Sequence, residues 1–347
     1  MSNRYKNILY TVILLLAMFI VYKYRQANNN DETIPMVQFS GKTMGPIVYN
    51  VKYFDAKERN FQQEVDSVLK VFNQSLNTYI PSSEISQFNR DTAFIFKLPY
   101  FETAVTKSRE IFTLTGGAFD PSIGPLINTW GFGYQKQINK DSAVIDSLRQ
   151  FTGLDKVLYT PGSIRKTDWR VQLDFSASAK GYGVDVVMDL LKNKGIKNAF
   201  VEIGGEVNAM GMNLTSQKPW KIGVLDPNSE EINPYFIATL ALSDKGMATS
   251  GNYFNYHIVD GVKYGHTISP HTGYPIQHSL LSASVLAEDC HTADALATAF
   301  MVFGLEKTKA FLQDHPQYDA FLVYSDDQGK LETYATPGIE PSINLVK

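Results

Sequence analysis

The stretch DFSASAKG, residues 174–181, decides how the rest of this chain is organised. An alternating run at 171–173 precedes it and predicts a buried strand. The apolar residues after it recur at helical spacing and predict a helix that ends at Gly195. Small residues in such a turn leave backbone groups open to a ligand, and a helix N-terminus favours a phosphate. The plainer interpretation is a strand-to-helix turn with Ser176 or Ser178 as the N-cap.

A second turn with uncovered backbone follows the strand predicted at 200–203. Gly204 and Gly205 permit close approach of the backbone to a ligand, and Glu206 can accept hydrogen bonds from that ligand. A β-bulge is the structural alternative.

The helix predicted at 291–303 carries Asp294 and Thr298 at positions i and i+4, on one face. An oxygen pair at this spacing suits a hard cation such as magnesium. Asp294 as a simple complement to the helix dipole is the alternative. Five histidines between 257 and 291 show no recognised zinc spacing, so zinc is not favoured. A Rossmann glycine motif is weak as well, because Val186 stands where its third glycine belongs.

A hairpin is predicted from strands at 256–259 and 262–267, which Asp260 and Gly261 would join. His266 lies on the return strand, just before a Ser-Pro turn. The position of this histidine makes it a candidate general base.

The segment 116–133 is rich in glycine, proline and aromatic residues without a clear period, and we interpret it as a ligand-facing wall. An ordered structural loop is the competing interpretation. A second hairpin is expected between strands at 157–159 and 171–174. The other predicted elements are strands at 36–54 (broken at 43–46), 221–224, 237–242 and 281–287, helices at 56–76, 99–114 and 142–151, and a final helix and hairpin near 318–324.

Composition narrows the class of protein. A chain of 347 residues with 44% hydrophobic content can bury a substantial core. Its net charge of -3 shows no basic excess, so nucleic acid is not an expected partner. Cys290 is the only cysteine, which excludes an internal disulfide and any cysteine-rich metal site. Strands and helices do not alternate regularly, so we expect an α+β fold of two interleaved α/β subdomains with mixed or antiparallel sheets and the site between them.

The N-terminus predicts export. Basic residues precede an apolar run from 8 to 21, and Lys23 and Arg25 follow it. No small-residue cleavage site follows and no cysteine is placed for lipidation, so residues 1–25 are interpreted as an uncleaved membrane anchor or signal segment, and 26–35 as a linker. The expected location is the periplasmic, extracytoplasmic side of a bacterial inner membrane.

Eight motifs in order resemble the ApbE-type flavin transferases. They are TMG (43–45), NTYIP (77–81), GGAFDPSIGPLINTWGFG (116–133), DFSASAKGYGVD (174–185), VEIGGEV (201–207), TSGNY (249–253), GHTISPHTGYP (265–275) and TADALATAFMVFG (292–304). The resemblance implies a magnesium-dependent FAD:protein FMN transferase over residues 36–340. Such an enzyme moves the FMN part of FAD to a Ser or Thr hydroxyl of an acceptor flavoprotein and releases AMP.

Site residues follow from this resemblance by position. Metal ligation is implied for the Ala177 carbonyl, Asp294 and Thr298. Some family members have an acidic residue where this chain has Ala297, which puts a second metal ion in doubt. FAD contacts are implied for Met44, Tyr79, Ala118, Phe119, Asp120, Asp174, Lys180 and Ile268.

The base is the least direct assignment. His266 falls in the family's HxI position and is the preferred candidate, with His257 as the runner-up and a structural histidine as the alternative. Two other functions stay open: a magnesium-dependent FAD pyrophosphatase that gives FMN and AMP, and a non-catalytic exported flavin-binding protein.

Overall fold

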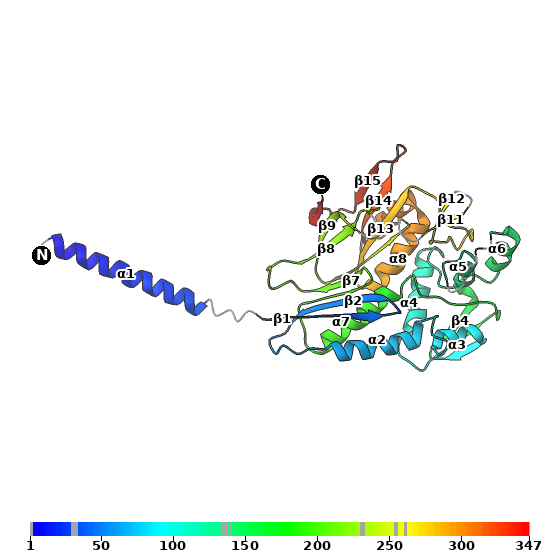
Figure 1. Cartoon of the computed structure of the whole chain (residues 1–347), viewed down its shortest axis with the longest axis horizontal. Helices are drawn as coiled ribbons and strands as arrows, with labels where there is room; N and C mark the ends of the chain where they lie inside the picture. Colours follow the sequence, from blue (N-terminus) through cyan, green and yellow to red (C-terminus); the bar gives the residue numbers. More distant parts are fainter. Residues whose placement is uncertain are drawn as a thin grey trace. The chain divides into compact units, whose positions relative to one another are not determined.

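The computed structural model describes residues 3–28, 34–133, 138, 140–229, 233–252, 256–259 and 262–346 (Figure 1). The chain divides into two compact units, Met1–Pro35 and Met36–Lys347. The first unit contains helix α1 (Asn3–Asn28). Its segment Tyr5–Lys23 has a mean hydropathy of 1.8, so it is long and apolar enough to cross a membrane, as a signal sequence also would be. Helix α1 continues into the predicted linker, of which residues 29–33 lie outside the described residues.

The second unit is built on an eight-stranded sheet in which every neighbouring pair is antiparallel. This arrangement confirms the α+β class and explains why the strands do not alternate with helices along the sequence. In sheet order the strands are β1 (Met36–Thr43), β2 (Ile47–Phe54), β6 (Ala199–Ile203), β7 (Glu206–Met210), β10 (Lys245–Gly251), β13 (Leu280–Ala287), β14 (Asp319–Ser325) and β15 (Leu331–Ala335).

Three smaller antiparallel sheets complete the described strands. The order of the first is β16 (Ile343–Leu345), β9 (Phe236–Leu242) and β8 (Trp220–Leu225). The order of the second is β3 (Ala93–Ile95), β5 (Ser163–Lys166) and β4 (Val157–Thr160). The hairpin of β11 (Tyr256–Val259) and β12 (Val262–Gly265) has the predicted pairing, although its Asp260-Gly261 turn lies outside the described residues.

The predicted helices form, with boundaries a few residues inside the expected ones. Burial of one apolar stripe supplies most of the stability of such a helix. The helices of the second unit are α2 (Gln62–Leu76), α3 (Glu84–Arg90), α4 (Phe101–Leu114), α5 (Gly124–Thr129), α6 (Ser142–Arg149), α7 (Ala179–Asn193), α8 (Cys290–Phe303) and α9 (Leu305–Asp314), with short 3₁₀ turns at Leu154–Lys156 and Glu340–Ser342.

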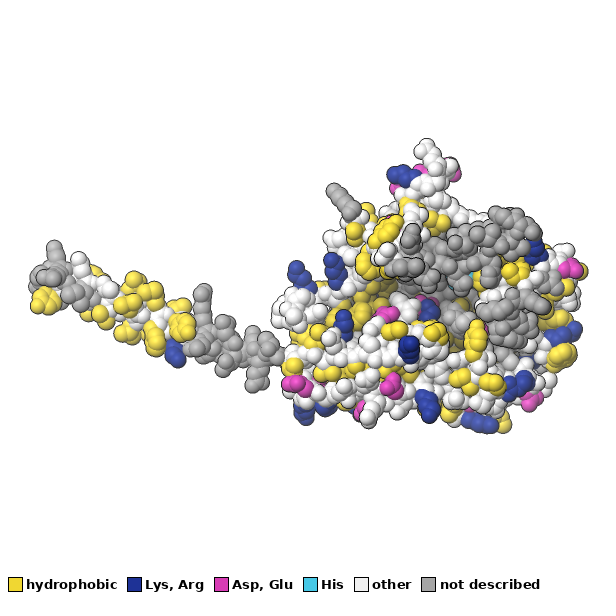
Figure 2. Space-filling view, viewed as in Figure 1, with side chains coloured by type: hydrophobic (Ala, Val, Ile, Leu, Met, Phe, Trp, Pro, Cys, Tyr) yellow, Lys and Arg dark blue, Asp and Glu magenta, His cyan; other side chains and the backbone are white. Residues whose placement is uncertain are grey.

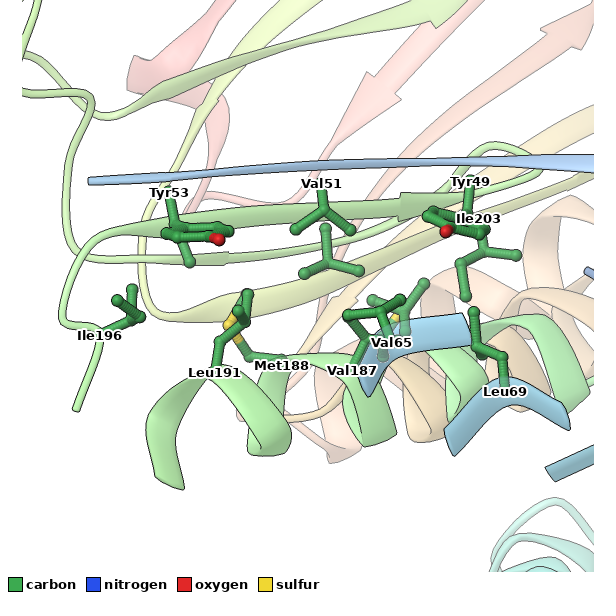
Figure 3. Packing of buried hydrophobic residues seen from close by; sticks show 14 of the residues in the cluster. Tyr49, Val51, Tyr53, Val65, Leu69, Val187, Met188, Leu191, Ile196 and Ile203 are labelled. Atoms are coloured by element: carbon green, nitrogen blue, oxygen red, sulfur yellow. The ribbon is translucent and has the colours of Figure 1, made fainter. Parts of the chain in front are cut away.

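Helices α2 and α7 cover one face of the large sheet. Figure 3 shows Tyr49 and Val51 of β2 pointing toward Val65 of α2 and Val187 of α7. All four side chains are at most 1% exposed, and burial of each stabilises the fold by about 1.5–3 kcal/mol. This packing holds the N-terminal end of α7 against the sheet.

The sheet of β8, β9 and β16 covers the opposite face. Along β6, Val201 packs toward the helices, whereas the ring of Phe200 lies 5.5 Å from the ring of Trp220 on β8. The alternation follows from the two-residue period of a strand. The fold therefore has helices on one side of the central sheet and a small sheet on the other (Figure 1).

One predicted hairpin is wrong. Strand β4 pairs with β5, its nearest neighbour in sequence, and not with residues 171–174. Gly162, with φ of 86°, takes the left-handed conformation that closes this short turn. Among the described residues, the pairing of the segment 171–174 is limited to an isolated parallel bridge from Gln172 to Ile123. Val171 and Leu173 are buried, so the alternating pattern indicated the burial of these side chains and not a strand pairing.

The segment 116–133 is also more regular than predicted, because it contains helix α5. Strand β12 ends at Gly265, so His266 is the first residue after the strand rather than part of it. Gly204 and Gly205 form the two-residue turn between β6 and β7, with φ of 59° and 104°, and not a bulge.

Candidate active site

A cavity of about 1000 Å³ brings together most of the residues that the sequence singled out. Figure 2 shows hydrophobic side chains in a hollow across the middle of one face, with acidic and basic side chains at its margin. The predicted site residues that line the cavity are Met44, Tyr79, Asp174, Ala177, Lys180, Glu206, His266, Ile268, Asp294 and Thr298.

Three predicted flavin contacts do not line the cavity. Ala118, Phe119 and Asp120 are buried, with at most 5% exposure. Burial raises the pKa of Asp120 to about 6, and its Oδ1 accepts a hydrogen bond from the Ser122 amide at 2.8 Å. Ala118 and Phe119 pack in a core cluster with residues of α8, and the Asp120 carbonyl oxygen accepts a hydrogen bond at 3.4 Å from the amide of Ile123, which does line the cavity.

The N-terminus of α7 opens into this cavity without a side-chain cap. Ser178 occupies the predicted N-cap position, but its hydroxyl makes no cap hydrogen bond. The buried Ser178 Oγ has no hydrogen-bond partner in the part of the chain that the structure describes. Ser176 instead donates its amide to Asp174 Oδ1 at 2.7 Å, which closes the turn before the helix. In the first turn of α7, however, the Ala179 amide donates to the Phe175 carbonyl at 2.7 Å and the Gly181 amide to Asp294 Oδ2, so the Lys180 side chain is the main group that would meet an anion here.

Lys180 and Glu206 form an ion pair inside the cavity, although 26 residues separate them in the sequence. The Glu206 side chain is 2% exposed, and its Oε2 has no hydrogen-bond partner among the described residues. Burial raises the pKa of Glu206, and the nearby Asp294 carboxylate adds to the shift while Lys180 opposes it. Loss of Lys180 would leave this carboxylate buried and unpaired.

Asp294 reaches the cavity from α8. Its side chain is 3% exposed, and its Oδ2 accepts a hydrogen bond from the Gly181 amide at 2.9 Å. Burial raises the pKa of Asp294, whereas the Lys180 ammonium and the Gly181 amide oppose that shift. The arrangement keeps a carboxylate at the cavity wall, where a cation would stabilise its charge.

Thr298 lies one turn further along α8, as the i, i+4 spacing predicted. Its hydroxyl donates to the Ala177 carbonyl oxygen at 3.3 Å and lies 3.3 Å from the Ser250 hydroxyl. The fold thus gathers the carboxylate of Asp294, the hydroxyl of Thr298 and the carbonyl of Ala177 on one cavity wall. All three groups offer oxygen atoms.

These oxygen atoms fit a hard divalent cation. The buried carboxylates of Glu206 and Asp294 both act on the Lys180 ammonium. Glu206 forms an ion pair with it, and the charge of Asp294 also favours its protonated form. No group of three or more His, Cys, Asp or Glu side chains suitable for a metal occurs within the described ranges. A cation here would therefore need the Thr298 hydroxyl and the Ala177 carbonyl beside Asp294, a donor set that magnesium accepts.

His266 enters the cavity from the segment after β12. It is half-buried, and its ring centre lies 6.3 Å from that of Phe132 in an edge contact. The next residue, Thr267, donates its hydroxyl to Asn252 Oδ1 at 2.9 Å and fixes this segment. The competing candidate His257 belongs to β11, but its side chain lies outside the described residues.

Asp185 is a half-buried carboxylate that the sequence analysis missed. It belongs to α7 and accepts hydrogen bonds from the backbone amides of Cys290 (3.0 Å) and His291 (2.8 Å), and from Asn208 Nδ2 (2.8 Å). Burial raises the pKa of Asp185 to about 7, while these donors oppose the shift. The carboxylate caps the start of α8 from a neighbouring helix. The only sequence signal was its i+4 position relative to Gly181, on the same face of α7.

Several other lining residues gave no sequence signal for a site. They come from β8 and β9, which are far from the 174–181 turn in sequence and reach it only through sheet packing. These residues are Lys221, Ile222, Gly223, Val224, Leu225 and Phe236. Thr249 and Ser250, from the predicted TSGNY motif, line the cavity as well.

Fold and site together define an antiparallel α+β protein with a large ligand cavity, whose buried acidic groups face the N-terminus of a helix. The chain belongs to the ApbE family, whose model matches residues 44–322. This match covers seven of the eight motifs completely, together with most of the eighth and the whole cavity wall.

Curated relatives agree with that assignment. A FAD:protein FMN transferase of Vibrio cholerae is 36% identical over 323 residues, which cover 90% of this chain and 95% of the relative. A protein of the same name from Haemophilus influenzae is 34% identical over 308 residues, or 85% of this chain and 88% of the relative. Like them, this protein is a transferase.

Solved structures share the fold. The flavin transferase ApbE from Vibrio cholerae superposes with a TM-score of 0.78 at 35% identity and covers 89% of this chain and 99% of its own. The apo form of the Pseudomonas stutzeri flavinyl transferase ApbE gives a TM-score of 0.78 at 31% identity, covering 89% of this chain and 96% of its own.

Proposed function

We propose that this enzyme transfers the FMN part of FAD to a Ser or Thr hydroxyl of an acceptor protein, in a magnesium-dependent reaction that releases AMP. The observation that carries the proposal is the wall of Asp294, Thr298 and the Ala177 carbonyl beside Lys180, in one cavity. The names of the relatives supply the flavin and the acceptor.

The cavity suits a dinucleotide. Its volume of about 1000 Å³ is at the upper end of the range of small-molecule sites. Lys180, in the first turn of α7, would bind the pyrophosphate through its ammonium group. Tyr79, which is 64% exposed at the cavity edge, would stack on one ring of the substrate. Met44, Asp174 and Ile268 would contact the rest of FAD.

The buried segment of Ala118, Phe119 and Asp120 would act indirectly, because Ala118 and Phe119 pack with α8 and the Asp120 carbonyl holds the amide of Ile123. Glu206 would orient Lys180 through the ion pair. These roles differ because Lys180 and Glu206 line the cavity, whereas the segment 118–120 does not.

Magnesium would be held by Asp294, Thr298 and the Ala177 carbonyl, and when bound would supply positive charge that offsets the charge of the pyrophosphate. The bond exchange at phosphorus then involves the acceptor hydroxyl, FAD and one protein side chain. The acceptor hydroxyl oxygen forms a bond to the FMN-side phosphorus, and the bond from that phosphorus to the AMP oxygen breaks. His266 takes the hydroxyl proton, because a Ser or Thr hydroxyl is a poor nucleophile at neutral pH.

The N-terminal segment would place this reaction outside the cytoplasm. Residues 1–25 would anchor the enzyme in the bacterial inner membrane, and residues 26–35 would link the anchor to the flavin transferase domain at 36–340. The apolar stretch Tyr5–Lys23 supports this assignment. Comparing membrane and soluble fractions of the full chain with those of a chain lacking 1–25 tests it.

The full chain, purified in mild detergent, tests the activity when incubated with FAD and magnesium, with and without an acceptor protein. We expect AMP release together with flavin fluorescence that stays on the denatured acceptor. AMP release without modification of any acceptor would identify a pyrophosphatase instead. Binding of FAD with no AMP release under either condition would contradict both reactions.

A further inference from the structure

Strand β8 ends its sheet with a free edge that faces the cavity. The sheet order is β16-β9-β8, so β8 pairs on one side only among the described strands. Within the described part of the chain, no backbone hydrogen bond joins residues 221–225 to any segment other than β9. Five consecutive residues, 221–225, line the cavity. Successive side chains of a strand point to opposite faces, so a cavity that meets all five must run along the edge.

The edge belongs to the same cavity as the proposed reaction centre. Phe200 and Glu202 of β6 line it as well, and so do Lys180 and Asp294. Glu202 accepts hydrogen bonds from the Gly205 amide at 2.7 Å and from Asn50 Nδ2 at 2.5 Å, so the β6–β7 turn beside the edge is held in place. The cavity therefore has a charged end suited to phosphates and an end lined by open backbone.

The proposed function demands such a backbone partner. A Ser or Thr hydroxyl lies only roughly 2.5 Å from its own Cα, so the acceptor backbone must itself enter the cavity for the oxygen to reach phosphorus. Amide and carbonyl groups that leave water need hydrogen-bond partners. An extended segment laid along β8 would obtain them from an unpaired strand edge.

We propose that the acceptor protein binds by adding an extended segment, which carries the modified Ser or Thr, as a strand on the free edge of β8. The inference rests on the proposed function and specifies how its protein partner is recognised. Phe236 of β9 would pack against this segment: its ring is 47% exposed, lines the cavity and covers Gly223, where an added Cβ would lie 2.4 Å from the ring.

Backbone N-methylation of a peptide tests strand addition directly. Decapeptides with one central threonine are screened with the full chain, FAD and magnesium, and an active peptide is then N-methylated at one residue at a time. Alternate amides of an added strand point to β8. We therefore expect kcat/KM to fall about tenfold or more when the methyl group is on every second amide, and to change little when it is on the amides between them. Loss without a two-residue period, or modification of folded acceptors but of no peptide, would overturn the proposal.

Two adjacent exposed aromatic residues provide matched variants. Phe236 lines the cavity, whereas Tyr235, 51% exposed, does not. Phe236→Ala should raise the KM of the active peptide about tenfold and leave the Kd for FAD within about twofold, while Tyr235→Ala should change neither. If Phe236→Ala weakens FAD binding instead, this end of the cavity holds the flavin and the proposal is wrong. Failure of AMP release with every acceptor would contradict the proposed function itself, a separate outcome.

Discussion

The Gly181 amide on α7 donates a 2.9 Å hydrogen bond to Oδ2 of Asp294 on α8. This contact exists because Gly181 has no side chain: a Cβ there would lie 2.3 Å from the Cys290 carbonyl oxygen and 2.7 Å from Asp294 Cβ. One glycine therefore sets the distance between the two helices and holds the carboxylate at the cavity wall. Asp185 reinforces the same pair of helices from the other end of the contact.

Gly181→Ala should destabilise the fold by about 1–3 kcal/mol, because the backbone of α8 cannot yield to the added methyl group. Transfer activity should fall with it, since Asp294 moves. Urea unfolding and initial transfer rates measure both effects. Gly124→Ala is the matched control: its Cβ would meet its nearest atom, Asp174 Cβ, at an ordinary 3.5 Å. Equal effects of the two substitutions would show that helix spacing is not the cause.

Asp294→Asn and Asp294→Ala should abolish magnesium-dependent transfer while the protein stays folded. The asparagine oxygen can still accept from the Gly181 amide, whereas alanine removes that acceptor, and neither side chain can balance the charge of a divalent ion. Thr298→Ala removes a neutral ligand and should be milder. Initial rates are measured against magnesium concentration, with circular dichroism as the folding control. Full activity of Asp294→Ala at low magnesium would refute the metal assignment.

His266→Ala or His266→Asn should keep FAD binding and lose on the order of a hundredfold or more in transfer rate, because the base is needed only for proton transfer. The rate and the Kd for FAD are measured on the same preparations. Normal transfer by the variant, or loss that follows entirely from lost FAD binding, would exclude His266 as the base.

The folded unit should bind FAD more tightly than FMN or riboflavin. Lys180 at the α7 N-terminus and the cavity volume of about 1000 Å³ favour a pyrophosphate that joins two ring systems. Quenching of flavin fluorescence, titrated with each of the three compounds, measures the affinities. Equal affinities would mean that the cavity recognises only the flavin ring.

His291 should contribute to acid lability. It is 3% exposed, stacks on Tyr182 with ring centres 4.5 Å apart, and burial lowers its pKa from the usual 6.5. Below pH 6.5 the unfolded chain binds a proton that the folded chain refuses, so stability falls as pH falls. Between pH 7 and 5.5 this should cost about 1 kcal/mol.

His291→Phe retains the stacking and removes the titration, so the wild-type protein should lose about 1 kcal/mol more than the variant over this pH range. Urea unfolding of both proteins at the two pH values gives the difference, and all other titrating groups cancel. Parallel pH profiles would show that His291 titrates normally.

Local pattern determined the elements of this protein. Helical spacing predicts α2, α4, α7 and α8, and the i, i+4 spacing alone places Asp294 and Thr298 on one face of α8. These features are readable because periodicity and turn chemistry depend on residues a few positions apart.

Tertiary structure decided what those elements meet. The alternation at 171–173 predicts buried side chains but does not predict which segment they pair with. The Lys180–Glu206 ion pair joins groups that are 26 residues apart in the sequence. The cap that Asp185 provides for α8 and the exposure of the β8 edge to the cavity likewise depend on packing of distant segments. Burial and partner choice are set by such long-range packing, which local spacing does not encode.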